Sequence, residues 1–165
     1  MRVCVCVCLS VCTYLSIVIH DYGVWEKQSA GFYKALSGGL SSRAGDSVTF
    51  RRNVVFNASR HGVNFQDSTG GSCSVEGNIF FNLNRETMDT SALNSWNRRT
   101  YIVSANDSAP AAPSLVPSTL NSWRNNLILG RNYYGVRDGN GNALRCDDGA
   151  SWYNMSNNIL YNADM

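Results

Sequence analysis

The stretch that decides the fold is "NVVFN", residues 53–57. It recurs as "NIFFN" at 78–82, "NLILG" at 126–130 and "NILYN" at 158–162. A run of three apolar residues predicts a short buried strand, whereas asparagine is a poor strand residue and a good turn residue. The interval from position 78 to position 126 is close to twice the interval from 53 to 78, which is in the twenties. A period of that size indicates a stacked repeat architecture.

Alignment on the first asparagine of each unit predicts which residues stack on one another. In such a repeat each strand pairs in parallel with its equivalent one coil away, at about 4.8 Å. The inward side chains then form apolar columns. Asparagines at equivalent turns are expected to stack into hydrogen-bonded ladders, and Asn also tolerates the left-handed conformation that a sharp corner needs.

The composition agrees with one folded domain of strands and turns. The chain has 165 residues, of which 44% are apolar and 16% are charged, with a formal net charge of +2. No long cluster of Lys and Arg is present, so a nucleic-acid partner is not expected. We expect a monomer whose repeat occupies residues 46–165.

The first nineteen residues stand apart from the repeat. They contain four of the six cysteines and only one charged residue, Arg2. A secretory signal is one interpretation, and it implies a secreted or cell-surface protein. An uncleaved membrane anchor over residues 3–19 and the translation of a GT dinucleotide repeat are the alternatives. Residues 20–45 are expected to form a linker or an incomplete first coil.

A proline-rich segment interrupts the repeat. Residues 104–119 contain all three prolines, which cannot donate a hydrogen bond within a sheet, so the segment predicts a projecting loop. The tetrapeptide "LNSW" occurs at 93–96 and again at 120–123. This echo indicates that the long interval between positions 78 and 126 holds one extra coil.

The repeated units, together with "SVEGNIFFN", "LNSWNRR" and "RCDDGASWYNMSNNILYN", resemble right-handed parallel β-helix proteins of the pectate-lyase-like superfamily. The resemblance covers residues 46–165 and implies an all-β, right-handed parallel β-helix (β-solenoid) of about five coils, with members of the group usually being longer. It implies carbohydrate binding or processing, by a lyase, epimerase or glycosidase-like activity on acidic polysaccharide. The alternatives are a non-catalytic structural or adhesion module and an inactive truncated fragment.

The predicted register places candidate catalytic residues one coil apart. Arg60 is expected to stack on Arg85, where two guanidinium groups would hold a uronate carboxylate. His61 is expected to stack on Glu86, where the carboxylate would raise the pKa of the imidazole for acid–base chemistry. The alternative is a solvated turn with a surface ion pair worth well under about 1 kcal/mol.

The same register predicts residues that would contact a glycan. Asp89 is expected to lie beside Asn64, and Tyr134 shares the position of His61 in its own unit. Trp96, with Arg98 close after it, is expected to offer an aromatic face to a sugar ring. Trp96, Trp123 and Trp152 recur at similar intervals and form either such an aromatic strip or a buried column.

Adjacent acidic residues give the one candidate for a metal site. Asp147 and Asp148 precede Gly149, and paired carboxylates in a turn are ligands that Ca²⁺ accepts. A plain Asp-Gly turn is the alternative. Cys73 and Cys146 lie far apart in the sequence and form either a disulfide or two free thiols.

Overall fold

The computed structural model describes residues 12–26, 29–34, 48–66, 73–87, 90–96, 120–130, 141–150 and 153–163. Every regular element in these ranges is a β-strand, and every strand pairing is parallel. Within the same ranges, no helix is long and apolar enough to cross a membrane.

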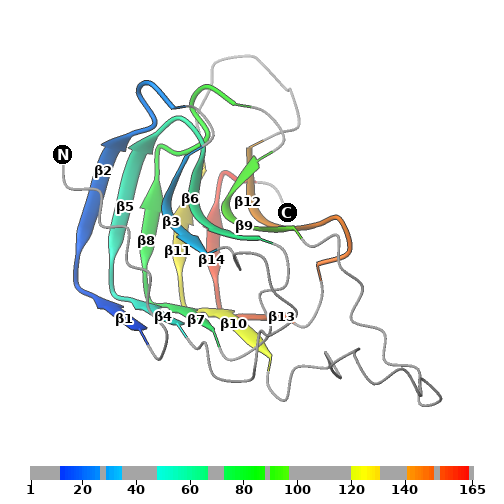
Figure 1. Ribbon diagram of the computed structural model, residues 1–165. Helices are drawn as coiled ribbons and strands as arrows, with labels where there is room; N and C mark the ends of the chain where they lie inside the picture. Colours follow the sequence, from blue (N-terminus) through cyan, green and yellow to red (C-terminus); the bar gives the residue numbers. More distant parts are fainter. Residues whose placement is uncertain are drawn as a thin grey trace, which may run out of the picture.

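Three parallel sheets run along the molecule (Figure 1). The first sheet has the order β1 (Cys12–Leu15), β4 (Val48–Arg51), β7 (Ser74–Glu76), β10 (Asn121–Arg124) and β13 (Tyr153–Ser156). The second has the order β2 (Val18–Tyr22), β5 (Val54–Ala58), β8 (Ile79–Phe81), β11 (Leu127–Leu129) and β14 (Ile159–Tyr161). The third has the order β3 (Ala30–Lys34), β6 (His61–Phe65), β9 (Thr90–Trp96) and β12 (Gly141–Asp147).

Successive strands of the chain fall in successive sheets, so β1–β3, β4–β6, β7–β9 and β10–β12 are four coils, and β13 and β14 belong to another. The chain is therefore a parallel β-helix, as the sequence predicted. The first of these coils occupies residues 12–34, ahead of residue 46, where the sequence predicted the repeat to begin.

A buried asparagine ladder joins the coils between the first and second sheets. The backbone N–H groups of Ile17, Asn53, Asn78 and Asn126 each donate to the side-chain oxygen of the asparagine one coil on. These four distances are 2.9, 2.8, 3.0 and 3.0 Å, and the ladder ends at Asn158. The expected ladder is confirmed, and it explains why each apolar unit begins with asparagine.

Each ladder side chain also satisfies a backbone carbonyl. The amide nitrogen of Asn78 donates to the carbonyl of Phe50 at 3.0 Å and to the side-chain oxygen of Asn126 at 2.9 Å. Asn78 is 1% exposed, so every one of these polar groups would be unsatisfied without its partner. At the corners, where strand pairing is interrupted, the asparagine side chain thus supplies the hydrogen bonds between coils that backbone groups supply within the sheets.

Left-handed residues turn the corners on both sides of the second sheet. The residue before each ladder position has φ between 54° and 65°: Ser16, Arg52, Gly77, Asn125 and Asn157. A second column, at or just beyond the ends of the strands, has φ between 50° and 54°: Asp21, Asn57, Asn82 and Asn162. Gly and Asn dominate these columns because both adopt the left-handed conformation at low cost.

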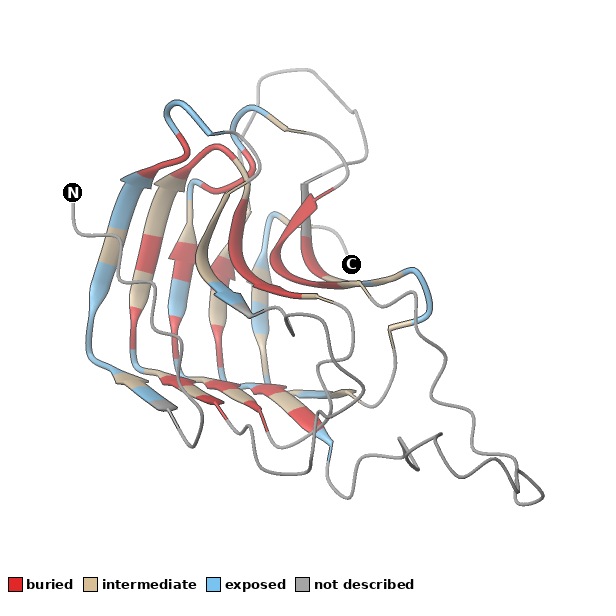
Figure 2. Ribbon diagram, viewed as in Figure 1, coloured by how far each residue is buried: buried red, intermediate tan, exposed pale blue. Residues whose placement is uncertain are grey.

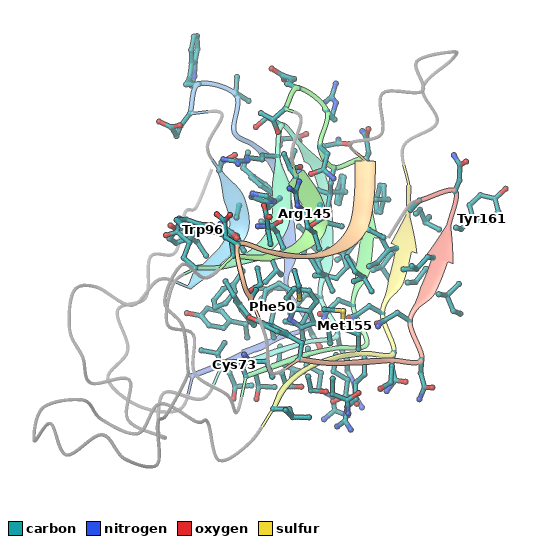
Figure 3. The ribbon with its side chains drawn as sticks, turned by 90° about the vertical axis from the view of Figure 1, so that its right-hand side faces the viewer. Phe50, Cys73, Trp96, Arg145, Met155 and Tyr161 are labelled. Carbon is teal, nitrogen blue, oxygen red and sulfur yellow. The ribbon has the colours of Figure 1, made fainter. Side chains whose placement is uncertain are left out.

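The core lies between the three sheets and is built from apolar columns (Figure 2). Its large, fully buried members come in turn from the first, second and third sheets: Phe50, Val75 and Trp123; Val55, Phe80 and Ile128; Val63, Phe65 and Leu93. Figure 3 shows Phe50 in the interior, whereas Tyr161 points away from the body. The ring centroids of Trp123 and Tyr153 lie 4.7 Å apart.

The register changes between the second and third sheets. Val54 of β5 pairs with Ile79 of β8, whereas Val63 of β6 pairs with Leu93 of β9, a partner further along the chain. The corner after β8 is therefore five residues longer than the corner after β5. A register fixed in the second sheet cannot be carried through such a corner, and this bears directly on the predicted site.

The long interval between positions 78 and 126 is a single coil. Ile79 pairs directly with Leu127, so the extra coil predicted in this interval is wrong. The first "LNSW" lies in β9 of the third sheet, whereas the second lies in and just before β10 of the first sheet. The two copies occupy different sheets, so they are not equivalent positions of a structural repeat. The proline-rich segment 104–119 lies outside the described residues.

The strands of the third sheet bend sharply. A Cβ atom on Gly62 would lie 2.8 Å from side-chain carbons of Phe80 and Leu83, so Gly62 faces the interior, as does the fully buried Val63 that follows it. Two successive inward-facing positions break the alternation of the strand. The equivalent positions all hold small residues: Gly31, Gly62, Ala92 and Ala143. Figure 1 shows the resulting curve, with its concave side facing away from the other two sheets.

Candidate functional site

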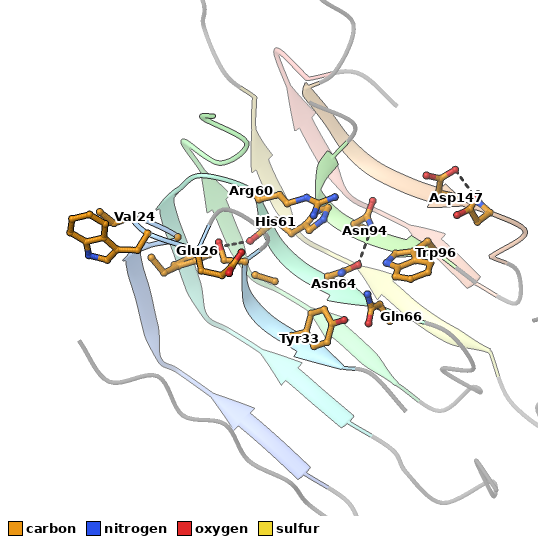
Figure 4. A pocket seen from close by; sticks show the side chains of 16 residues that line it. Val24, Glu26, Tyr33, Arg60, His61, Asn64, Gln66, Asn94, Trp96 and Asp147 are labelled. Atoms are coloured by element: carbon orange, nitrogen blue, oxygen red, sulfur yellow. Dashed lines mark hydrogen bonds between the residues drawn. The ribbon is translucent and has the colours of Figure 1, made fainter. Parts of the chain in front are cut away.

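The concave outer face of the third sheet holds a pocket of about 650 Å³ (Figure 4). All four coils that contribute to this sheet line it, from the loop between β2 and β3 to the end of β12. The bend creates the hollow, and the strand alternation beyond the bend decides which side chains face into it. The pocket therefore follows from the small residues at the bend.

A column of polar side chains forms the floor of the pocket. Tyr33, Asn64 and Asn94 occupy the same position in successive coils. The Asn94 amide nitrogen donates to the Asn64 side-chain oxygen at 2.9 Å, and the hydroxyl of Ser91 donates to the oxygen of Asn94 at 3.3 Å. Asn64 and Asn94 are each 4% exposed, so their amides are held rigidly at the base of the pocket.

Aromatic side chains lie at one end of this column and beside it. Trp96 ends β9 at one side of the pocket, and it pairs in register with Asp147 of β12. Tyr33 is half exposed and lies in the next coil but one. Trp25 stands in the loop between β2 and β3 and is 92% exposed. Figure 4 shows Tyr33 and Trp96 on either side of Asn64.

His61 lines the pocket, and hydrogen bonds to its ring and to its backbone carbonyl fix its position. Its Nδ1 atom lies 3.2 Å from the carbonyl oxygen of Ser91, and because a carbonyl only accepts, Nδ1 carries the hydrogen. The hydroxyl of Tyr22 donates to the carbonyl of His61 at 2.6 Å. Burial raises the pKa of Tyr22, which keeps this hydroxyl a donor. His61 is thus fixed in one orientation and is 2% exposed.

Arg60 directly precedes β6 and also lines the pocket. Its Nε atom is buried and has no hydrogen-bond partner among the residues that the structure describes. An anionic ligand in the pocket would compensate the charge of the guanidinium group that carries this buried atom. Arg60 is therefore the strongest single indication of ligand chemistry in the pocket.

The predicted stacking of Arg60 on Arg85 and of His61 on Glu86 is wrong. The longer corner after β8 puts Ser91 beside His61, while the backbone N–H groups of Arg85 and Glu86 donate to the carbonyls of Ala58 and Ser59. Arg85 and Glu86 are exposed and do not line the pocket. The expected pairing of Asn64 with Asp89 is wrong for the same reason, since Asn64 pairs with Asn94.

Arg85 acts at another surface. A hydrogen bond with His20 lowers the pKa of the exposed Asp21 carboxyl, and Asn57 and the charge of Arg85 lower it further. Asp21 lies at the end of the second sheet. The charge of Arg85 therefore stabilises the ionised carboxylate of Asp21 at that corner.

Asp147 and Asp148 line the pocket at its far end, but the groups around Asp147 are those of a turn. One Asp147 oxygen accepts from the backbone N–H of Asp148 at 2.9 Å, and the other lies 2.8 Å from Nη2 of Arg145. Among the described residues there is no group of three or more His, Cys, Asp or Glu side chains that would hold a metal ion. The turn interpretation therefore fits Asp147 better than a Ca²⁺ site.

The remaining sequence predictions concern the tryptophans, the two cysteines and four residues outside the described part of the chain. Trp96 lines the pocket, whereas Trp123 is fully buried in the core, so no single aromatic strip includes both. Cys73 and Cys146 are free thiols, and burial raises the pKa of Cys146 to about 11. The residues Asp89, Arg98, Tyr134 and Trp152 lie outside the described part of the chain.

Sequence reasoning did not assign the floor of the pocket, although a signal for it exists. The third-sheet strands share a pattern of small, apolar and polar residues: "GFY" at 31–33, "GVN" at 62–64, "ALN" at 92–94 and "ALR" at 143–145. Alignment on this pattern pairs Val63 with Leu93, as the structure does. It also puts Tyr33, Asn64 and Asn94 in one outward column.

Comparison with known proteins adds no assignment: no family model, no curated protein and no solved structure matches this chain.

Proposed function

We propose that this protein binds a glycan chain in the concave pocket of the third sheet. The observation that carries the proposal is the lining itself, in which Tyr33, Asn64 and Asn94 occupy one position in three successive coils along a hollow that spans four. Coils are about 4.8 Å apart, so the pocket offers similar contacts at regular steps. A ligand that is itself a chain of similar units matches that arrangement.

The chemistry of the lining suits sugars. Aromatic rings such as Trp96 and Tyr33 present flat apolar faces with polar tips, which suit the flat C–H face of a sugar ring and the hydroxyls around it. Carboxamides such as Asn64, Asn94 and Gln66 both donate and accept hydrogen bonds, as sugar hydroxyls do. A mostly formed pocket with a few fixed polar groups is the usual form of a small-ligand site.

Binding without bond cleavage is the form of the proposal. The acid–base pair expected from the sequence is not assembled, because Glu86 lies on an exposed corner and His61 stacks beside Ser91. The side chain of Asp147 is engaged by Arg145 and by a backbone N–H. A polysaccharide lyase or epimerase would need a base and an acid placed on one substrate, and these contacts favour a binding role.

The test is calorimetric titration with neutral hexasaccharides: xylohexaose, cellohexaose, mannohexaose and fully methyl-esterified hexagalacturonate. We expect saturable binding to at least one of them. Trp96→Ala should weaken that binding roughly tenfold, since buried aromatic contacts commonly contribute at least that much. Tyr161→Ala is the matched control, because Tyr161 is 67% exposed on the second sheet and does not line the pocket.

Two results would count against the proposal. One is the absence of binding to every hexasaccharide, neutral or carrying carboxylates, and the other is equal weakening by Trp96→Ala and Tyr161→Ala. Ultraviolet absorbance of unsaturated product, followed in the same samples, measures elimination. A rise in that absorbance would replace the binding role by a lyase activity.

A further inference from the structure

We infer that the preferred glycan carries one anionic group, held by Arg60, with uncharged sugar units on either side. This inference rests on the proposed glycan-binding function and concerns the charge pattern of the ligand. It is argued from the distribution of charged side chains along the pocket.

The centre of the pocket carries a single arginine among the described residues that line it. This residue, Arg60, belongs to the second of the four coils, and its buried Nε atom has no hydrogen-bond partner in the described part of the chain. His61 and Asn64 follow it in β6. A carboxylate or sulfate at this point would receive charge-assisted hydrogen bonds, which are about twice as strong as neutral ones.

Both ends of the pocket carry carboxylates. Glu26 stands in the first coil, in the loop between β2 and β3, while Asp147 and Asp148 stand in the fourth coil. Figure 4 shows Glu26 and Asp147 on opposite sides, with Arg60 and His61 between them. With His61 neutral, the described lining has Arg60 against three carboxylates, and Arg145, which pairs with Asp147 at 2.8 Å, leaves a formal charge of −1.

This pattern separates three classes of glycan. A polyuronate with a charge on every unit would place carboxylates against Glu26 and Asp148, and like charges at close range oppose binding. A neutral glycan would fill the pocket but offer no negative charge to the guanidinium group of Arg60. A glycan with one anionic unit among neutral ones satisfies Arg60 and avoids both carboxylate ends.

The experiment compares hexagalacturonate in three forms: fully methyl-esterified, with one free carboxylate near the middle, and fully de-esterified. Xylohexaose with and without one 4-O-methylglucuronate branch provides a second backbone. On the backbone that binds, we expect the singly charged form to bind about tenfold more tightly than the neutral form, as one charge-assisted contact would give. The fully de-esterified form should bind more weakly than the singly charged one.

Charge variants of the protein sharpen the comparison. Arg60→Met should remove the preference for the singly charged form, with thermal unfolding followed by circular dichroism to verify the fold. Glu26→Gln combined with Asp148→Asn should strengthen binding of the fully de-esterified form. Low ionic strength should enlarge both effects, because exposed charges are screened by salt.

The outcomes distinguish the two proposals. Equal affinity for the neutral and singly charged forms would overturn the inference about Arg60 and leave glycan binding intact. The tightest binding by the fully de-esterified form would overturn it as well. Failure of every form on both backbones would overturn the glycan-binding function, and this inference with it.

Discussion

At the scale of the residue, the side-chain amide of asparagine makes the hydrogen bonds that a backbone peptide group would make. Asn78 accepts a hydrogen bond from the backbone N–H of Asn53 and donates to the carbonyl of Phe50 and to the side chain of Asn126. It does so while 1% exposed. No aliphatic residue of similar volume would satisfy these groups.

Asn78→Ala should therefore destabilise the protein by roughly 3 kcal/mol, because it leaves a buried N–H and a buried carbonyl without partners. Urea-induced unfolding measures the change. Asn82→Ala is the control: Asn82 is exposed and has φ 50°, so its replacement should cost only about 1 kcal/mol, for the left-handed backbone. Equal costs for the two variants would contradict a special role of the buried ladder.

Arg52 occupies a left-handed position that Gly or Asn fills in the next three coils. It has φ 54°, and its counterparts there are Gly77, Asn125 and Asn157. Arg52→Asn should raise the melting temperature and Arg52→Val should lower it, because a β-branched residue is a genuine outlier at positive φ. Arg51→Val removes the same charge from the neighbouring strand position, where φ is not positive, and should show neither trend.

At the scale of the element, the third-sheet strands determine the pocket because they bend. Gly62 faces the interior and leaves no room for a Cβ atom, which would lie 2.8 Å from Phe80, Leu83 and the carbonyl of Ala92. The bend in turn directs Asn64 outward into the pocket. The bend of the strands and the shape of the pocket are therefore one feature.

Gly62→Ala should cost roughly 2 kcal/mol in the free energy of unfolding, the usual range for overpacking a core. It should also weaken glycan binding, since relief of the clash would shift β6. Gly77→Asn is a control, because a Cβ atom there would have only the Cγ of Arg52 nearby, at 4.0 Å. A stable Gly62→Ala protein with unchanged binding would disprove the link between the bend and the pocket.

The elements also show where sequence reasoning succeeds and where it stops. The units that begin with asparagine gave the register of β5, β8, β11 and β14 correctly, because the ladder and the left-handed residue before it fix the start of each strand. The site depended on the next strand, beyond a corner of variable length. Five extra residues after β8 replace Glu86 by Ser91 as the neighbour of His61, and units aligned on their first asparagine do not mark that insertion.

The first coil was harder to predict because its signature residues differ. Ile17 stands at the ladder position and Ser16 and Asp21 at the left-handed corners, so the asparagines that mark later coils are absent. Ile17 nevertheless donates its backbone N–H to Asn53. The ladder needs a side-chain amide only from the following coil, which is why its first member tolerates isoleucine.

At the scale of the whole molecule, the coil assignment can be tested by a disulfide. Ile79 and Leu127 pair directly across the long interval that contains the proline-rich segment. An Ile79→Cys/Leu127→Cys protein should form that disulfide, because adjacent strands are about 4.8 Å apart and disulfides span Cα distances up to about 7 Å. An intervening coil would double the distance and prevent it. Peptide mapping by mass spectrometry, with each single variant as control, identifies the bond.

The proposed glycan site lies on the concave face of the stacked-coil fold. The most direct test is a nitrogen-edited NMR titration with the hexasaccharide that binds best. Shifts should concentrate on the indole signal of Trp96 and the side-chain amides of Asn64, Gln66 and Asn94, and spare the buried Trp123 and the ladder amide of Asn126. Saturable binding with shifts confined to the outer faces of the first and second sheets would contradict the account.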